Sequence, residues 1–225
     1  MTMLTYETIW DDLARQDARE AILTGADEEK WESTGRSNAD RVLELCTPDS
    51  IVLGIGCGAG RMEKYIAPGV AALHAVDISS EMIRLAKQRL AGQSHCYLYH
   101  IKPGEYLRRF PDGFFDVAYS YLVLQHLERE HAWHYLIELH RVLKPEGRAS
   151  IQFPNLLSKL YTDSFIDQAT LYPSPARVRC YTASEARHIF SLAHFEVQKL
   201  DFFPEQQEPE HLAISREMFF TLQNT

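Results

Sequence analysis

Four glycines fall within seven positions of this chain, directly after a short aliphatic run. They are Gly54, Gly56, Gly58 and Gly60, and residues 50–53 precede them. A buried strand that turns through glycines into a helix presents backbone N–H groups to a ligand. Glycine is needed in such a turn because a Cβ would block it or hold the ligand away from the backbone. The stretch therefore predicts a ligand-binding turn at the edge of a sheet.

An acidic residue, Asp77, lies 23 positions after Gly54, at the end of the next aliphatic run. A carboxylate at the tip of a second strand accepts hydrogen bonds from both hydroxyls of a ribose, and about 20 residues is the usual spacing. We therefore predict that Asp77 binds a ribose. Two ligand classes remain open, because Gly54-x-Gly56-x-x-Ala59 fits the dinucleotide fingerprint and Gly56-x-Gly58-x-Gly60 fits the loop of S-adenosylmethionine enzymes.

The elements that must position these residues alternate between short apolar runs and helical periods. This pattern predicts an α/β fold with a doubly wound, mostly parallel seven-stranded sheet whose last strand is antiparallel, because a short polar turn precedes it. The later strands are expected at 71–76, 96–100, 115–120, 149–153, 195–202 and 211–218. Helices are expected at 4–24, from Ser37 to about 46, at 80–90, at 128–143 and after Thr182, with a loop at 31–35.

The chain divides into two predicted regions. Residues 1–48 are expected to form an amino-terminal helical cap or lid, with plain coverage of the core as the alternative. Residues 49–225 form the main domain. Within it, residues 155–181 are too apolar and aromatic for a linker, and they occupy the place of a substrate lid.

Composition narrows the classes of function. The chain has 225 residues and a net charge of −8, so it lacks the basic character of a nucleic-acid partner. Its four cysteines are scattered without metal-ligand spacing, which predicts reduced thiols, a cytoplasmic location and no metal site. No apolar run reaches membrane-spanning length, so no membrane association is expected. The sequence carries no signal for an oligomeric state.

Four segments resemble the motifs of a known protein family, and they occur in the same order as in that family. They are residues 52–61, residues 75–79 with Met82-Ile83, residues 114–120, and Arg141-Val-Leu-Lys-Pro-Glu-Gly147. Across about residues 36–153 the chain resembles the class I S-adenosylmethionine-dependent methyltransferases. The last segment favours this family most, because dehydrogenases have no reason to end a helix in this way. The resemblance implies a Rossmann-like methyltransferase fold, S-adenosylmethionine as cofactor, and methyl transfer to the O or N of a small-molecule acceptor.

The resemblance also implies individual cofactor contacts. They are expected at Gly54, Gly56, Gly58, Asp77, Ile78, Ser79, Glu105, Ser120 and Tyr121. Ile78 would lie against adenine, Glu105 would reach the adenine amino group, and Ser120 and Tyr121 would line the methionine side. One position departs from the family, because Gly54 stands where an acid usually helps to hold the amino-acid end of the cofactor. That task would then move to Arg61 or to the amino-terminal helices.

The acceptor side is described by fewer residues. His126 is the candidate general base, although a structural or gating role is the favoured interpretation. Tyr161 and Tyr172 are expected to shape an apolar substrate pocket, and Arg177 and Arg179 to anchor an anionic group. Two alternatives remain: a cofactor-binding protein without transferase activity, and an NAD-dependent oxidoreductase.

Overall fold

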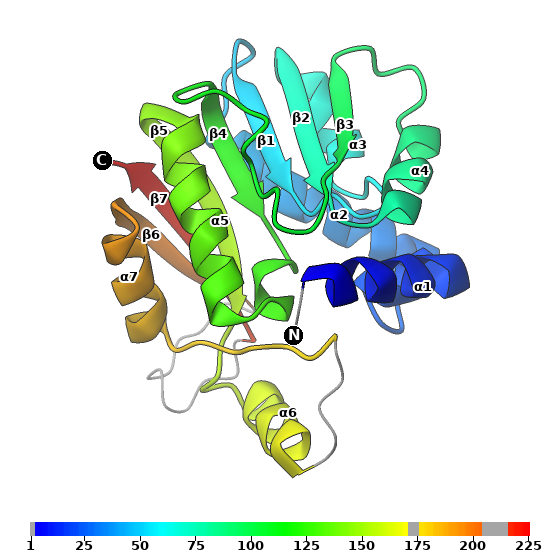
Figure 1. Cartoon of the computed structure of the whole chain (residues 1–225), viewed down its shortest axis with the longest axis vertical. Coiled ribbons are helices and arrows are strands. Elements are labelled where there is room, and N and C mark those ends of the chain that lie inside the picture. Colours follow the sequence, from blue (N-terminus) through cyan, green and yellow to red (C-terminus); the bar gives the residue numbers. More distant parts are fainter. Residues whose placement is uncertain (1–2, 171–175, 204–215) are drawn as a thin grey trace.

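A seven-stranded sheet forms the centre of the computed structural model, which describes residues 3–170, 176–203 and 216–225 (Figure 1). Its strand order is β3-β2-β1-β4-β5-β7-β6. The strands are β1 (Ile51–Ile55), β2 (Ala72–Asp77), β3 (Cys96–His100), β4 (Phe115–Ser120), β5 (Leu143–Pro154), β6 (Phe195–Phe203) and β7 (Glu217–Asn224). The first five run parallel, and β7 is antiparallel to β5 and β6. The predicted fold class, including the antiparallel last strand, is confirmed.

The position of the last strand was predicted wrongly. We expected it at 211–218, of which residues 211–215 lie outside the described residues, and it runs from Glu217 to Asn224. The reason lies in the side chains of Met218, Phe220 and Leu222, which are fully buried. Because a strand's register follows the face that must be buried, these three residues set its position.

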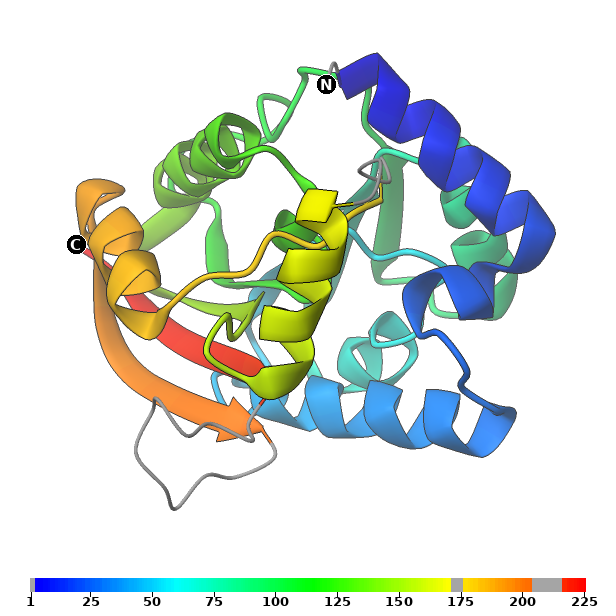
Figure 2. The same ribbon diagram turned by 90° about the horizontal axis from the view of Figure 1, so that it is seen from below.

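Helices cover both faces of the sheet, as Figure 2 shows. On one face, side chains of α5 (Arg129–Val142) and α7 (Ala183–Leu192) share a core with Leu53 and Ile55. On the other, α2 (Glu28–Leu43) and α3 (Glu63–Ile66) share a core with Val52, and α4 (Ser80–Arg89) packs beside them. Successive residues of a strand point to opposite faces, so β1 serves both cores. The short helices η1 (Ala67–Gly69) and η2 (Leu124–His126) complete the connections.

Helix α2 begins earlier than predicted. The expected loop at 31–35 lies inside it, because Asp27 caps the helix and its Oδ1 accepts a hydrogen bond from the Lys30 backbone at 2.8 Å. Gly35 looks like a helix breaker in the sequence. Here it provides space, since a Cβ at Gly35 would lie 2.9 Å from the Cγ atom of Arg61.

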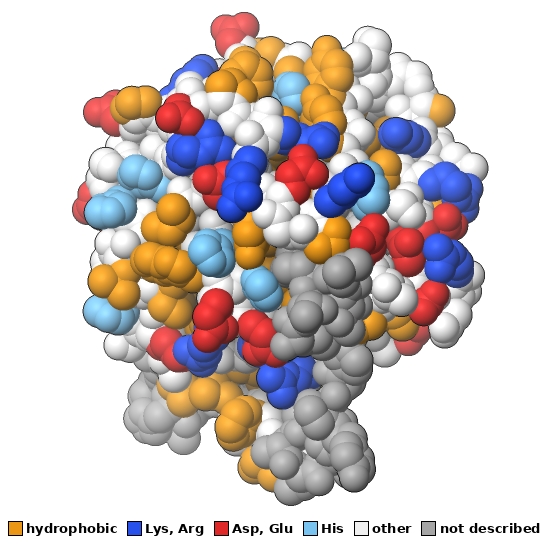
Figure 3. Space-filling model, viewed as in Figure 1, with side chains coloured by type: hydrophobic (Ala, Val, Ile, Leu, Met, Phe, Trp, Pro, Cys, Tyr) orange, Lys and Arg blue, Asp and Glu red, His pale blue; other side chains and the backbone are white. Residues whose placement is uncertain are grey.

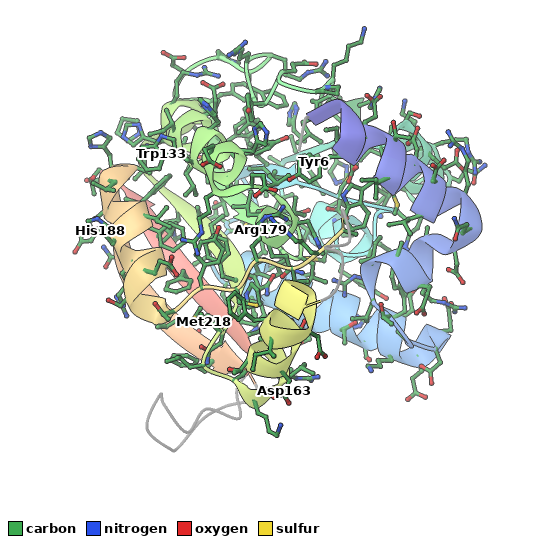
Figure 4. All side chains as sticks on the ribbon, turned by 60° about the horizontal axis from the view of Figure 1, so that its bottom comes forward. Tyr6, Trp133, Asp163, Arg179, His188 and Met218 are labelled. Carbon is green, nitrogen blue, oxygen red and sulfur yellow. The ribbon has the colours of Figure 1, made fainter. Side chains whose placement is uncertain are left out.

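Two helices lie across the edge of the sheet at which the parallel strands end. Helix α1 (Met3–Ile22) is broken at Asp17, and α6 (Lys159–Thr170) falls within the predicted insertion at 155–181 (Figures 1 and 2). Residues 176–181, which include Arg179, cross the same edge, and Figure 4 shows Arg179 between Tyr6 on α1 and Asp163 on α6. Among the described residues, no helix combines the length and the apolar content needed to span a membrane.

Candidate functional site

A pocket lies at the carboxyl ends of β1, β2 and β4, where the strand order reverses on either side of β1. Open α/β sheets bind ligands at this switch point. Residues from the glycine turn, the end of β2, the segment after β4 and α1 all contribute to the walls. Among them are Gly56, Gly58, Arg61, Glu63, Asp77, Ile78, Tyr119, Tyr121, Val123 and His126, together with Tyr6, Trp10, Ala21 and Ile22 of α1.

The glycine turn at the base of the pocket requires its glycines for two reasons. Gly56 and Gly58 have φ angles of +75° and +53°, a conformation that side chains disfavour. A Cβ on Gly56 would also lie 2.2 Å from Cγ2 of Val123, and one on Gly58 would lie 2.6 Å from Cδ1 of Ile22. The turn is therefore closed over by a residue from the segment after β4 and by one from α1.

Asp77 connects the glycine turn to the end of β2. Its Oδ2 accepts a hydrogen bond from the Gly58 backbone at 2.8 Å, and its Oδ1 accepts one from the Ser79 backbone at 2.8 Å. Burial raises the pKa of Asp77, and these backbone donors oppose the shift. Each carboxylate oxygen can accept two hydrogen bonds, so each keeps capacity toward the pocket that Asp77 lines. These remaining acceptor positions fit the two hydroxyls of a ribose.

Gly54 does not line the pocket. It lies in the sheet opposite Tyr119 of β4, and a Cβ on Gly54 would be 2.6 Å from the Tyr119 hydroxyl oxygen. The expected direct contact between Gly54 and a ligand is therefore not supported by the structure. Its lack of a side chain lets the tyrosine ring cross β1.

We expect Gly54→Ala to destabilise the fold by about 1 to 3 kcal/mol, the usual cost of overpacking a core. The added methyl group would have to displace the Tyr119 ring. Urea denaturation of Gly54→Ala, alone and combined with Tyr119→Leu, measures the effect. If the collision is the cause, the loss caused by Gly54→Ala shrinks in the Tyr119→Leu background; an equal loss in both backgrounds would contradict this account.

Two other predicted contacts, Ser79 and Ser120, have structural partners instead. The Ser79 hydroxyl caps α4 by accepting from the Met82 backbone at 3.1 Å. The Ser120 hydroxyl donates to the Ile55 carbonyl at 3.4 Å. Neither hydroxyl-bearing residue is among the pocket-lining residues.

The structure does not support the predicted contact between Glu105 and adenine. The Glu105 carboxylate accepts from the Lys102 backbone at 3.0 Å and from Nε of Arg109 at 2.8 Å, and it does not line the pocket. Hydrogen bonds inside its own turn hold it away from the site at which adenine was expected.

Arg61 lines the pocket and also joins the glycine turn to α2. Its Nη1 donates to the Thr34 hydroxyl at 3.1 Å, and its guanidinium carbon lies 5.5 Å from the ring centre of Trp31. Burial lowers the pKa of Arg61, with Glu63 acting in the opposite direction.

His126 is held in the neutral form. Burial lowers its pKa to about 4. Its Nδ1 donates to the Ala176 carbonyl at 2.9 Å, since a carbonyl oxygen only accepts, and its Nε2 lies 3.2 Å from the amide nitrogen of Gln125. The imidazole also packs edge-on against Trp10, with ring centres 5.0 Å apart. With both nitrogens engaged, His126 joins three segments at the wall of the pocket and has no free lone pair for a base.

The predicted substrate residues do not gather at the pocket. Arg177 and Arg179 both pair with Glu128 and line a separate hollow. Nη2 of Arg177 lies 3.4 Å from Oε1 of Glu128, and Nε of Arg179 lies 3.1 Å from Oε2 of Glu128. The Tyr161 hydroxyl donates to Glu217 at 2.7 Å, while Tyr172 lies outside the described residues. Both cations that we expected to meet an anionic substrate are paired with Glu128 instead.

Sequence reasoning missed several pocket residues. Tyr6 and Trp10 lie on α1, and the Tyr6 hydroxyl accepts from the Glu128 backbone at 3.0 Å. Their helical spacing placed them in a cap, but no pattern along the chain indicates which face of that cap meets the glycine turn. Glu63 was also missed, because an acid three residues after Gly60 looks like an ordinary helix-surface residue.

Comparison with known proteins agrees with this geometry. A family model described as a methyltransferase domain matches residues 53–151. The ubiquinone/menaquinone biosynthesis C-methyltransferase UbiE of Geotalea daltonii is 28% identical over 109 residues, which cover 46% of this chain. The match spans 45% of that relative's length.

Solved structures share the fold over nearly the whole chain. Magnesium protoporphyrin IX methyltransferase (ChlM) from Synechocystis PCC 6803 with bound SAH (S-adenosylhomocysteine) has a TM-score of 0.73 at 17% identity, covering 99% of each chain. The [4+2]-cyclase SpnF has a TM-score of 0.74 at 15% identity, covering 100% of this chain and 97% of the other.

Residues 53–151 match a methyltransferase domain, and the sheet order and the glycine turn with Asp77 agree with the class I S-adenosylmethionine-dependent methyltransferase superfamily. The resemblance noted in the sequence is thereby confirmed. S-adenosylmethionine is the cofactor of this superfamily.

Proposed function

We propose that this protein transfers a methyl group from S-adenosylmethionine to a small-molecule acceptor. The observation that carries the proposal is the pocket at the switch point, where Asp77 and the glycine turn form one wall and α1 forms another. A pocket bounded by a helix on its open side suits a small molecule better than a folded macromolecule.

The cofactor would be held by residues already described. Asp77 accepts hydrogen bonds from a ribose, Ile78 offers an apolar surface to adenine, and Gly56 and Gly58 allow close approach of the backbone. When bound, S-adenosylmethionine supplies an electrophilic methyl group on a sulfonium. Tyr6, Trp10 and Ile22 would exclude water from that group, so the chain's contribution is alignment and a dry site.

The state of His126 bears on the choice of acceptor. A neutral imidazole with both nitrogens engaged favours an acceptor that is nucleophilic without the help of histidine. The relative from Geotalea daltonii is named as a C-methyltransferase. We therefore include carbon as a third candidate acceptor atom, beside the oxygen and nitrogen expected from the sequence.

The surface supports the choice of a small molecule. On the side of the molecule that Figure 3 shows, basic and acidic side chains are intermixed. A nucleic-acid partner would favour a continuous basic stripe. The net charge of −8 points the same way.

An acceptor screen tests the proposal. The protein is incubated with S-adenosylmethionine and with acids, phenols, amines and quinones, and the release of S-adenosylhomocysteine is followed. We expect release with at least one class of acceptor. If the protein binds the cofactor tightly and every acceptor class gives no release, the alternative of a cofactor-binding protein without transferase activity is favoured.

We further propose that residues 1–48 act as a lid through α1. Asp11 of α1 accepts hydrogen bonds from the Ser79 hydroxyl at 2.6 Å and from the Glu81 backbone at 3.1 Å, at the start of α4. Partial burial acts to raise the pKa of Asp11, but these donors outweigh it and lower the pKa. The contact fixes α1 over the pocket.

We expect Asp11→Ala to speed dissociation of S-adenosylhomocysteine by about tenfold or more, the scale of a lost hydrogen bond to a charged group. The association rate should change little, because the pocket walls remain. Stopped-flow tryptophan fluorescence measures both rates through Trp10. Asp12→Ala, on an exposed neighbour, is the control. Equal dissociation rates in wild type and Asp11→Ala would argue against the lid.

A further inference from the structure

Glu63 is a buried acid in the wall of the pocket. It is the first residue of α3, only 1% exposed, and lies beside the glycine turn. Its Oε1 accepts a hydrogen bond from the Tyr119 hydroxyl at 2.5 Å. Its Oε2 is buried and has no hydrogen-bond partner among the described residues. A buried carboxylate oxygen without a partner is costly, so a donor from a ligand is the expected complement.

The packing of three residues explains how an acid comes to this place. Gly54 and Tyr119 are direct neighbours on β1 and β4, so their side-chain positions share one face of the sheet. Because Gly54 has no side chain, the Tyr119 ring crosses over it and reaches Glu63. An acid at position 54 would collide with this ring. The Tyr119 ring thus occupies the space that an acid at position 54 would need. Glu63 approaches the same region from α3.

We propose, on the basis of the proposed function, that Glu63 is the receptor for the α-ammonium group of S-adenosylmethionine and that Tyr119 positions it. The Glu63 carboxylate substitutes for the acid that position 54 lacks. Its unpartnered Oε2 would accept from the ammonium, while Oε1 stays on the Tyr119 hydroxyl. An amino-acid end is a zwitterion, and Arg61, two residues away in the same wall, adds a positive charge toward its carboxylate.

The electrostatic setting agrees with a site that waits for a cation. Burial raises the pKa of Glu63 to about 7, with the Tyr119 hydrogen bond and Arg61 acting to lower it and Asp77 to raise it. The Tyr119 pKa is raised well above its usual value by burial and by Glu63, so the phenol stays a donor. The nearby thiols of Cys57 and Cys96 have pKa values raised by burial and by Glu63, and remain neutral. Glu63 is thus half protonated near neutral pH, and a bound ammonium would favour its charged form.

Two ligands separate the ammonium contact from the rest of the site. S-adenosylhomocysteine carries the amino-acid end, and 5′-methylthioadenosine keeps the adenosine and sulfur without it. By calorimetry at neutral pH, we expect Glu63→Gln to weaken S-adenosylhomocysteine about 10- to 100-fold, the scale of a hydrogen bond to a charged group. Its affinity for 5′-methylthioadenosine should stay within about twofold of wild type, since that ligand has no ammonium. Glu29→Gln, an exposed site on α2, makes the same charge change and should affect neither ligand.

The dependence on pH gives a second measurement that needs no variant. Below the Glu63 pKa the protein must lose a proton to bind the ammonium, so affinity falls as pH decreases. We expect wild-type affinity for S-adenosylhomocysteine to rise about tenfold between about pH 5.5 and pH 7, a range in which the ligand's amine stays protonated. The affinity for 5′-methylthioadenosine, which lacks the α-amino group, should rise much less over the same range. Titration of Asp77 affects both ligands and cancels in this comparison.

Each outcome decides between definite alternatives. Loss of both ligands in Glu63→Gln would assign Glu63 a structural role and overturn the proposal. Unchanged binding with slower methyl transfer would make it a general base, and would also overturn the proposal. If Glu63→Gln does not fold, equal pH slopes for the two wild-type ligands overturn it and unequal slopes support it. Wild-type protein that binds neither S-adenosylhomocysteine nor 5′-methylthioadenosine would refute the proposed function itself.

Discussion

Replacing Asp77 by alanine is expected to weaken the binding of S-adenosylhomocysteine by about 1.5 to 3 kcal/mol, the scale of lost hydrogen bonds to a charged group. Two effects combine, because the carboxylate is expected to accept from the ribose and it also holds the Gly58 and Ser79 backbones. Isothermal calorimetry measures the change.

Two variants make the Asp77 result specific. Asp77→Asn keeps one acceptor oxygen and should lose less affinity than Asp77→Ala. Asp112→Ala removes an acid that is 81% exposed and far from the pocket lining, and should bind like wild type. An unchanged dissociation constant in Asp77→Ala would show that the ribose lies elsewhere.

Gly56→Val is expected to abolish measurable binding and also to destabilise the protein by about 2 to 5 kcal/mol. From the sequence alone, we expected a side chain in this turn to block it or to hold the ligand away from the backbone. The structure adds a cost inside the protein, since Gly56 has a φ of +75° and a Cβ would lie 2.2 Å from Val123. Left-handed backbone costs about 1 to 2 kcal/mol in a residue with a side chain, and overpacking adds about 1 to 3 kcal/mol.

Gly92→Val separates these causes. Gly92 has a φ of +95° with nothing within 4 Å of its added Cβ, so it reports backbone strain alone. Urea denaturation should place Gly92→Val between wild type and Gly56→Val, with binding retained. Binding of S-adenosylhomocysteine by folded Gly56→Val at wild-type affinity would refute the site.

The fold could be predicted where local pattern decides the structure. Strands β3 and β4 lie where the sequence indicates, and Asp116 at the start of β4 has a structural role, because it accepts from the Ile51 backbone and pairs with Lys144. The errors at α2 and β7 have another origin. The environment of Gly35 and the burial of Phe220 depend on residues distant in sequence, which no local pattern contains.

The candidate site also has a part that local sequence predicts and a part that depends on distant residues. The glycine turn and Asp77 are joined by backbone hydrogen bonds at a spacing that the sequence displays. Glu63 becomes a pocket residue only because Tyr119 crosses Gly54 on the neighbouring strand. Arg177 and Arg179 looked available for a substrate until the fold brought Glu128 against them.

Fold similarity alone leaves the reaction open. A structure named as a [4+2]-cyclase matches this chain as closely as one named as a methyltransferase. The site therefore decides the reaction, beginning with the ligand that it binds.

Calorimetry of the wild-type protein with S-adenosylhomocysteine and, separately, with NAD tests the central claim most directly. Both ligands carry an adenosine ribose for Asp77, so only the remainder of the pocket distinguishes them. The structure-based account predicts saturable binding of S-adenosylhomocysteine with one site per chain, and at least about 100-fold weaker binding of NAD, a difference of about 2.7 kcal/mol. Preferential binding of NAD would contradict the account and favour an oxidoreductase.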